Sequence, residues 1–259
     1  MSVRTRAVLL NSAALRESDL LAVFYTLKLG KVRALVKGAK RSRKRFLGIM
    51  LHLNELEIEL APLRGREIEF RLENADLVRS RLSLALNLEK LACAFALAEL
   101  VEKASPEMES DPELFRLLND GIDAVSTPKS HREAFCQFQL DILNRLGYLP
   151  ALDRCAGCGG RLEAKLGSLC FSVPRGGFVC QRCAMREKSL LQLSAGLARS
   201  LSSISRAGKS LADRIRLAEK DWLPVVNLLF SFTAWHLEKP LSSLGFLADI
   251  SSPRTCAPS

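Results

Sequence analysis

Four cysteines in two closely spaced pairs constrain the fold of this chain more than any other feature. Cys155 and Cys158 form one CxxC motif, Cys180 and Cys183 form a second, and 21 residues separate the two motifs. A CxxC turn directs two thiolates at one point, and two such turns facing each other make a tetrahedral cage for zinc. Glycines beside both motifs relieve the tight backbone. We therefore predict a zinc ribbon that holds one structural Zn²⁺ ion.

A four-thiolate cage is closed, so it leaves no open coordination position for chemistry. The other cysteines need not belong to it: Cys93 and Cys136 lie in helical patterns, and Cys256 lies in a Ser/Pro tail. Cys170, midway between the motifs, stays open as an alternative ligand. Eight cysteines and no recognisable secretory signal predict a protein of a reducing compartment that binds a metal rather than forming disulfides.

The first 75 residues carry short apolar runs and alternating patterns that are typical of β-strands. Apolar runs occur at 5–11 and 20–26, and alternating residues occur at 32–36, 56–60 and 68–72. Five short strands in a segment of this length favour a small barrel, and the OB-fold is the common five-stranded form. We predict an OB-fold barrel over residues 1–80.

One segment between the third and fourth predicted strands is strongly basic. The chain has a net charge of +10, and its first 80 residues hold sixteen Lys/Arg against nine Asp/Glu. Six of these cations fall within residues 37–46, which contain no acidic residue. Such self-repulsion is unfavourable unless a polyanion relieves it, although a solvated loop that only aids solubility is the alternative. The predicted DNA-binding residues are Lys37, Lys40, Arg41, Arg43, Lys44 and Arg45.

From residue 83 the apolar period becomes helical. Helices are predicted at about 83–103, 111–125, 130–146, 194–206 and 222–238, with a further short helix at 212–219. Asp111 is the expected cap of the second helix, Gly147 ends the third, and Pro224 is expected in the first turn of the last. The sequence contains no run of about 18 apolar residues, so we predict no membrane span.

The predicted fold class is α+β multidomain: an N-terminal OB-fold β-barrel followed by an α-helical domain with an inserted four-cysteine zinc ribbon. We expect the barrel at 1–80, the helical domain at 81–150 and 190–250, the zinc-binding insertion at 151–189 and a frayed tail at 251–259.

A zinc deaminase is the enzymatic alternative. His131 and Glu133 match the HxE part of that signature, and Cys155 and Cys158 follow. Arg154 stands where a proline is expected, however, and the second CxxC motif offers the first pair better partners. No phosphate-binding loop and no GxSxG motif occurs. We therefore predict a protein that is not an enzyme. A zinc-ribbon OB-fold protein that binds RNA or the transcription machinery is the other alternative.

The order of these parts resembles the RecO family of bacterial recombination mediators, over most of the chain. The motifs that carry the resemblance are Ala7-Val8-Leu9-Leu10, Glu17-Ser18-Asp19, Thr26, Gly30-Lys31, Lys37-Gly38-Ala39 and Arg45-Phe46, then Leu146-Gly147-Tyr148 with the four cysteines, then Lys239-Pro240-Leu241-Ser242-Ser243. Ser242 and Leu244 depart from the family pattern, in which basic residues are frequent at these positions.

The resemblance implies a DNA-repair protein without catalytic activity. Such proteins bind single- and double-stranded DNA and anneal complementary strands. With RecR they help load RecA onto DNA coated by single-stranded-DNA-binding protein, whose acidic C-terminal tail they bind through the helical domain. RecA is thus an indirect partner, and no membrane is involved.

Overall fold

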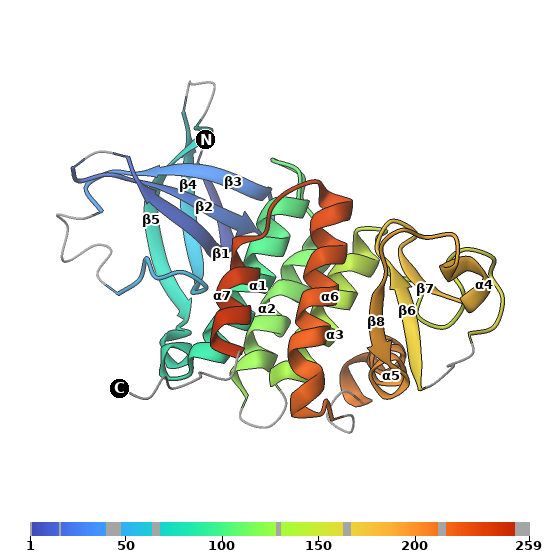
Figure 1. Cartoon of the computed structure of the whole chain (residues 1–259). Coiled ribbons are helices and arrows are strands. Elements are labelled where there is room, and N and C mark those ends of the chain that lie inside the picture. The colour runs from blue at the N-terminus through green and yellow to red at the C-terminus, as the bar shows by residue number, and fades with distance from the viewer. Residues whose placement is uncertain are drawn as a thin grey trace. The chain divides into compact units, whose positions relative to one another are not determined.

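The alternating apolar residues near the N-terminus form a closed five-stranded barrel (Figure 1). Neighbouring strands follow the order β1-β2-β3-β5-β4, and every pair is antiparallel except β3 with β5, which is parallel. The prediction of an OB-like barrel is therefore confirmed. Its strands are β1 (Val3–Ala14), β2 (Leu20–Thr26), β3 (Gly30–Val36), β4 (Glu55–Pro62) and β5 (Phe70–Arg79).

The computed structural model describes residues 2–15, 17–39, 48–63, 68–127, 131–162, 167–211 and 216–251. The chain divides into two compact units, Met1–Ser126 and Thr127–Ser259. Each unit is described by itself below. In the described part of the chain, no helix has the length and apolar character needed to cross a membrane.

The barrel core follows directly from the period of two in the sequence, because successive side chains of a strand face opposite sides. In β3, Val32, Ala34 and Val36 are buried inside, whereas Lys31 and Arg33 lie between them on the outer face. In β4 the buried residues are Leu56, Ile58 and Leu60. This alternation leaves the outer face of the barrel for charged side chains.

Two α-helices complete the first unit. The single helix predicted at 83–103 is wrong in detail: a 3₁₀ turn, η1 (Leu82–Leu86), precedes α1 (Leu88–Ala104). The break lies at Asn87, whose side-chain oxygen accepts a hydrogen bond from the Lys90 amide at 3.0 Å and so caps α1. Helix α2 (Pro112–Ser126) has the predicted cap, since the Asp111 carboxylate accepts from the amides of Glu113 and Leu114.

The segment between α1 and α2 lies directly against the turn between β2 and β3. The Met108 amide donates to the Lys31 carbonyl at 2.9 Å, and Lys31 Nζ donates to the carbonyls of Glu102 and Ser105 at 2.8 and 2.6 Å. Gly30 adopts a left-handed φ of 69°, and a Cβ atom there would lie 1.8 Å from the Glu109 carbonyl oxygen. Only glycine permits this approach.

The second unit combines helices with a small sheet. Strands β6 (Ser168–Ser172), β7 (Gly177–Val179) and β8 (Leu191–Ser194) form a three-stranded sheet in the order β7-β6-β8, with the short helix α4 (Gln181–Ala184) between β7 and β8. The long helices are α3 (His131–Arg145), α5 (Ala195–Leu211), α6 (Glu219–Leu237) and α7 (Ser242–Ser251). Figure 1 labels each of them.

Three helix predictions in this unit are wrong. The helix expected at 212–219 is not formed over its described residues 216–218, which precede α6. Because α6 begins at Glu219, Pro224 lies inside the helix and not in its first turn. Helix α7 was not predicted, because its apolar residues do not follow a clear helical period. The predicted end of α3 is confirmed: Gly147 has a left-handed φ of 80°, and the Tyr148 amide donates to the Leu143 carbonyl.

The predicted domain division concerns which parts of the chain fold independently. The compact units place α1 and α2 with the barrel and α3 with the zinc ribbon. Compactness does not measure independent folding, so the division into 1–80, 81–150 with 190–250, 151–189 and 251–259 stays a prediction.

Candidate functional site

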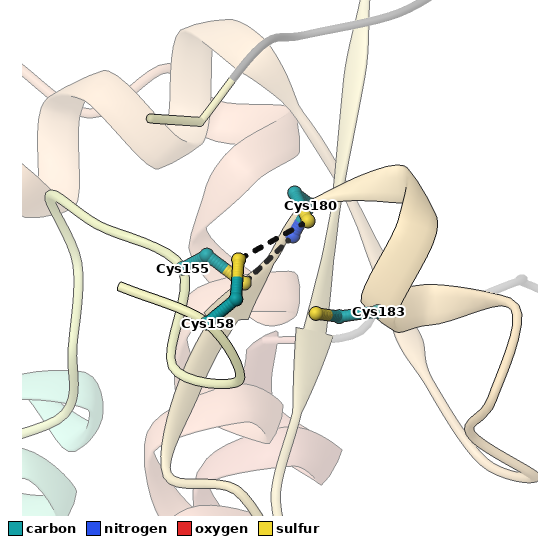
Figure 2. A group of neighbouring side chains, drawn as sticks. All are labelled: Cys155, Cys158, Cys180 and Cys183. Carbon is teal, nitrogen blue, oxygen red and sulfur yellow. Dashed lines mark hydrogen bonds between the residues drawn. The ribbon is translucent and has the colours of Figure 1, made fainter. Parts of the chain in front are cut away.

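The four predicted cysteines meet at one point of the second unit (Figure 2). All four Sγ atoms lie within 4.8 Å of one another, and Cys158 Sγ is 3.8 Å from Cys180 Sγ. A tetrahedron with zinc–sulfur bonds of about 2.3 Å has an edge of about 3.8 Å, so this spacing fits a single metal ion. The donor set, four thiols and no carboxylate, favours zinc over magnesium or calcium. The residues therefore fit the predicted structural ion.

Two tight turns hold the sulfur atoms in place. In the first, the Cys155 amide donates to the Gly160 carbonyl and the Gly159 amide donates to the Cys155 carbonyl. In the second, Cys180 precedes α4 and Cys183 lies within it. Gly157 brings the turns together, because a Cβ atom on it would lie 3.0 Å from Cys183 Sγ. Larger residues at this position would push the two cysteine pairs apart.

Backbone amides prepare the sulfurs for a cation. Burial acts to raise the pKa of Cys155, but amides that include Cys180 (3.2 Å) and Gly157 (3.4 Å) donate to its sulfur and lower the pKa to about 6. The amide of Gly160 is the main reason that the pKa of Cys158 is lowered. Hydrogen bonding with Cys180 chiefly raises the pKa of Cys183 to about 12. A bound metal ion would deprotonate its thiol ligands.

The ribbon packs on α6 through aromatic side chains. Phe171 and Phe178 are fully buried and meet edge to face at 5.3 Å between ring centroids, and Phe171 also contacts Phe232 at 6.0 Å. The ring of His236 packs on that of Phe232, with 4.4 Å between the ring centroids. A few aromatic contacts hold the ribbon to the helices, so the metal cage is its main internal support.

The other candidate ligands lie apart from the cage. Among the described residues, the group of His, Cys, Asp and Glu side chains close enough to share an ion consists of the four cysteines alone. Cys170 lies on β6, opposite Val179. Glu133, the proton shuttle of the deaminase alternative, is buried and accepts a hydrogen bond from the Leu217 amide at 2.8 Å. This arrangement disfavours the deaminase alternative.

The predicted DNA-binding residues lie mostly outside the described residues. This applies to Lys40, Arg41, Arg43, Lys44 and Arg45, and to Phe46. Lys37 is described and is exposed just beyond β3. The described residues on both sides of this segment are attached to the barrel, so its two ends are fixed even though the cations themselves are not described.

On the N-terminal side, the Gly38 amide donates to the Asp19 carboxylate at 2.9 Å. On the C-terminal side, Ile49 and Met50 pack against the barrel core. His52 then contacts Ser12 of β1 at 2.9 Å, and burial lowers the pKa of His52 against the opposing effect of Glu102. Residues 40–47 are therefore bounded by two attachments to the same barrel.

A buried arginine completes the C-terminal attachment. The side chain of Arg81 is 2% exposed, and burial is the main reason that its pKa is lowered to about 10. Its guanidinium donates to the Leu53 carbonyl at 2.6 Å, to Asn119 Oδ1 at 2.8 Å and to Asp123 Oδ1 at 3.0 Å. Leu53 has a left-handed φ of 71°, which is rare for a branched residue. Arg81 thus ties this strained turn to α2, a role that sequence patterns did not indicate.

Replacing Arg81 by methionine should lower the free energy of unfolding by roughly 3 kcal/mol, because it leaves the Leu53 carbonyl and Asn119 Oδ1 without their buried donor. Arg79→Met is the matched control, since Arg79 contacts the same Asp123 but is 51% exposed. We expect a loss below about 1 kcal/mol for the control. Urea denaturation measures both, and equal losses would contradict the role given to Arg81.

The other arginines that the structure describes on the barrel strands form ion pairs with carboxylates. Arg6 contacts Glu55 at 2.5 Å, Arg33 contacts Glu107 at 2.5 Å, and Arg4 contacts Glu57. Arg71 likewise contacts Glu73. These pairs neutralise the outer face of the barrel locally.

The fold and the site together define a class of protein: an OB-like barrel with a basic segment, followed by helices and a four-cysteine cage suited to a metal ion. Family models described as recombination protein O N terminal and recombination protein O C terminal match residues 1–81 and 85–245. The chain therefore belongs to the recombination protein O (RecO) family, and the resemblance seen in the sequence is confirmed.

Relatives named DNA repair protein RecO match along nearly their whole length. The protein of Desulfatibacillum aliphaticivorans is 31% identical over 250 residues, which is 96% of this chain and 97% of the relative. That of Geobacter metallireducens is 32% identical over 249 residues, 96% and 98% of the two chains. The protein of Myxococcus xanthus is 27% identical over 245 residues, which is 94% of this chain and 96% of the relative.

Proposed function

We propose that this protein is a non-catalytic DNA-binding mediator of recombinational repair. It binds single- and double-stranded DNA through the basic segment of its barrel and anneals complementary strands. With RecR it helps load RecA onto DNA coated by single-stranded-DNA-binding protein, and it also binds the acidic C-terminal tail of that coat protein. The site of action is the bacterial cytoplasm, at the nucleoid. Family membership supports the repair role, and the charge distribution supports the DNA-binding role.

The proposal rests on where the excess positive charge of residues 1–80 lies along the chain. Within residues 1–80, the stretches that the structure describes hold eight Lys/Arg and eight Asp/Glu. The whole excess of seven positive charges therefore belongs to short segments between strands. These segments hold eight cations against one acidic residue, Glu67. The cations are Lys40, Arg41, Arg43, Lys44, Arg45, Arg16, Arg64 and Arg66.

This distribution suits a polyanion that is gripped without regard to sequence. The strands carry ion-paired charges, and five of the unbalanced cations fall in one connection, residues 40–47, whose two flanking segments are attached to the barrel. Cations that contact phosphates position a nucleic acid but do not read its bases. The same cations lower the repulsion between two strands, so annealing requires no further chemistry.

Alanine substitution of Lys40, Arg41, Arg43, Lys44 and Arg45 together should weaken DNA binding and flatten its salt dependence. About six phosphate contacts give a slope near −4 for log affinity against log salt on single strands, and removing five cations should bring it towards zero. Fluorescence anisotropy with oligothymidylate at several salt concentrations measures the slope.

Arg71→Ala with Arg116→Ala is the control, because both arginines are exposed and both are paired with neighbouring glutamates. The slope should remain near its original value in this variant. An unchanged slope in the five-alanine variant would remove the basic segment from the DNA site. A clear preference for RNA over single-stranded DNA in competition would instead favour an RNA-binding protein.

The proposed ion is one Zn²⁺ held by Cys155, Cys158, Cys180 and Cys183. When bound it supplies no reaction, because four protein ligands fill its coordination shell. Its part is structural: it holds the two turns of the ribbon together.

A further inference from the structure

Four arginines surround the cysteine cage without an acidic partner. Arg154 and Arg182 each precede a cage cysteine, and Arg161 and Arg186 each follow one by three positions. We call them the knuckle arginines. All four are exposed, and none forms an ion pair with a residue that the structure describes. They contrast with the arginines of the barrel strands, which are paired.

The two acidic residues of the ribbon that the structure describes, Asp153 and Glu187, have other partners. Asp153 accepts a hydrogen bond from Ser202 and lies 3.8 Å from Arg206, both on α5. Glu187 is bound by Arg175 and accepts a hydrogen bond from Ser172 at 3.5 Å. Because these two carboxylates have other partners, no acidic residue of the ribbon that the structure describes pairs with a knuckle arginine.

The negative charge of a cage with a bound metal ion would also be too small to balance the positive charge of the ribbon. The described residues of the ribbon, 151–162 and 167–194, hold six Lys/Arg and two Asp/Glu, an excess of four positive charges. Four thiolates around a divalent ion carry a net charge of −2, which offsets only half of that excess. Arg175 already responds to the cage: its pKa is raised first by Glu187 and then by Cys183 and Cys155.

The cage also draws together the two backbone turns that carry the knuckle arginines. Arg154 and Arg161 are partners in an antiparallel bridge. The Arg186 amide donates to the Cys183 carbonyl at 3.1 Å, which keeps it at the end of the second turn. Because the four sulfurs lie within 4.8 Å of one another, the backbones of the two turns that carry these arginines lie beside the same point. A planar guanidinium matches a phosphate with two parallel hydrogen bonds, so this group suits phosphates well.

We propose that the knuckle arginines are a second DNA site, which binds the phosphate backbone independently of the basic segment in the barrel. A peptide partner is less suited to this surface, because Met185 and Leu191 are the only large apolar residues exposed among the described residues of the ribbon. Two phosphate-binding sites on one chain allow a single molecule to hold two strands at once. The inference rests on the proposed function for the identity of the polyanion.

The test compares two double variants that lower the net charge equally. Arg154→Gln with Arg182→Gln removes two knuckle arginines, whereas Arg199→Gln with Lys220→Gln removes two exposed cations of α5 and α6. On oligothymidylate, we expect the salt slope of the first variant to fall in magnitude by about 1.4, the value for two phosphate contacts, and that of the second to stay unchanged. One zinc ion per chain in both variants would show that the ribbon remains folded.

A second measurement tests whether one protein molecule holds two DNA strands at once. Two non-complementary oligothymidylates with different fluorophores should show energy transfer when one protein holds both. The knuckle variant and the five-alanine barrel variant should each abolish this transfer while retaining binding of one strand. Because the two variants are measured separately, failure of the barrel site and failure of the knuckle site are distinguishable.

Two results would overturn the inference. Equal changes of slope in the knuckle and control variants would mean that only net charge matters. An unchanged DNA slope in the knuckle variant, together with lost binding of a polyglutamate peptide, would instead make this surface a site for an acidic protein.

Discussion

Replacing Cys158 by serine should release the metal ion and unfold the ribbon between residues 151 and 194. Structural zinc sites in small peptides contribute an apparent binding free energy of about 10–16 kcal/mol, which is folding free energy for the segment that carries them. The ribbon has little else to replace it: its sheet has three short strands, and its fully buried aromatic residues are Phe171 and Phe178. Metal content and amide hydrogen exchange in β6 and β7 measure the two losses.

Cys170→Ser is the matched control, because Cys170 lies in the same sheet but outside the cage. It should retain one ion per chain and normal protection of β6. If Cys158→Ser kept the ion and the protection, the four cysteines would not form the metal site. Retention in Cys158→Ser with loss in Cys170→Ser would make Cys170 a ligand.

DNA binding by the Cys158→Ser variant separates the two DNA sites. The basic segment belongs to the barrel, so its contribution to the salt slope should persist after the metal is lost. The contribution of the knuckle arginines should disappear, because the turns that gather them are no longer held together. Loss of all DNA binding in a protein whose barrel remains folded would contradict this division.

Replacing Gly30 by alanine should lower the free energy of unfolding of the first unit by more than about 4 kcal/mol, a loss that few single substitutions reach. The new Cβ atom would lie 1.8 Å from the Glu109 carbonyl oxygen, so backbone must move. That movement would break the contacts of Lys31 and Met108 that fix the segment before α2. Urea denaturation followed by circular dichroism measures the loss.

Gly38→Ala separates the steric effect from backbone strain. Gly38 also has a left-handed φ, 65°, but nothing lies within 4 Å of a Cβ atom at that position. We expect a loss of only about 1–2 kcal/mol, the cost of the left-handed conformation. Similar losses for Gly30→Ala and Gly38→Ala would show that the approach of Glu109 is not what requires glycine.

The features that local sequence predicts correctly are those that depend on near neighbours. Three strands follow from a period of two and two from short apolar runs, and the cluster of four cysteines follows from two CxxC turns. The cap at Asp111 is a contact over two or three residues. The prediction failed at 212–219 and at α7, where short amphipathic stretches depend on long-range packing.

By itself, the sequence therefore determined the barrel, the clustering of the four cysteines and the basic segment, because each follows from the spacing of residues along the chain. Only the tertiary structure decided that Gly30 meets Glu109 and that Arg81 is buried under Leu53 and α2. It also decided which arginines have acidic partners among the described residues: those of the barrel strands have them, and the knuckle arginines do not. Ion pairing depends on which faces meet after folding, and one-dimensional charge counts do not contain that information.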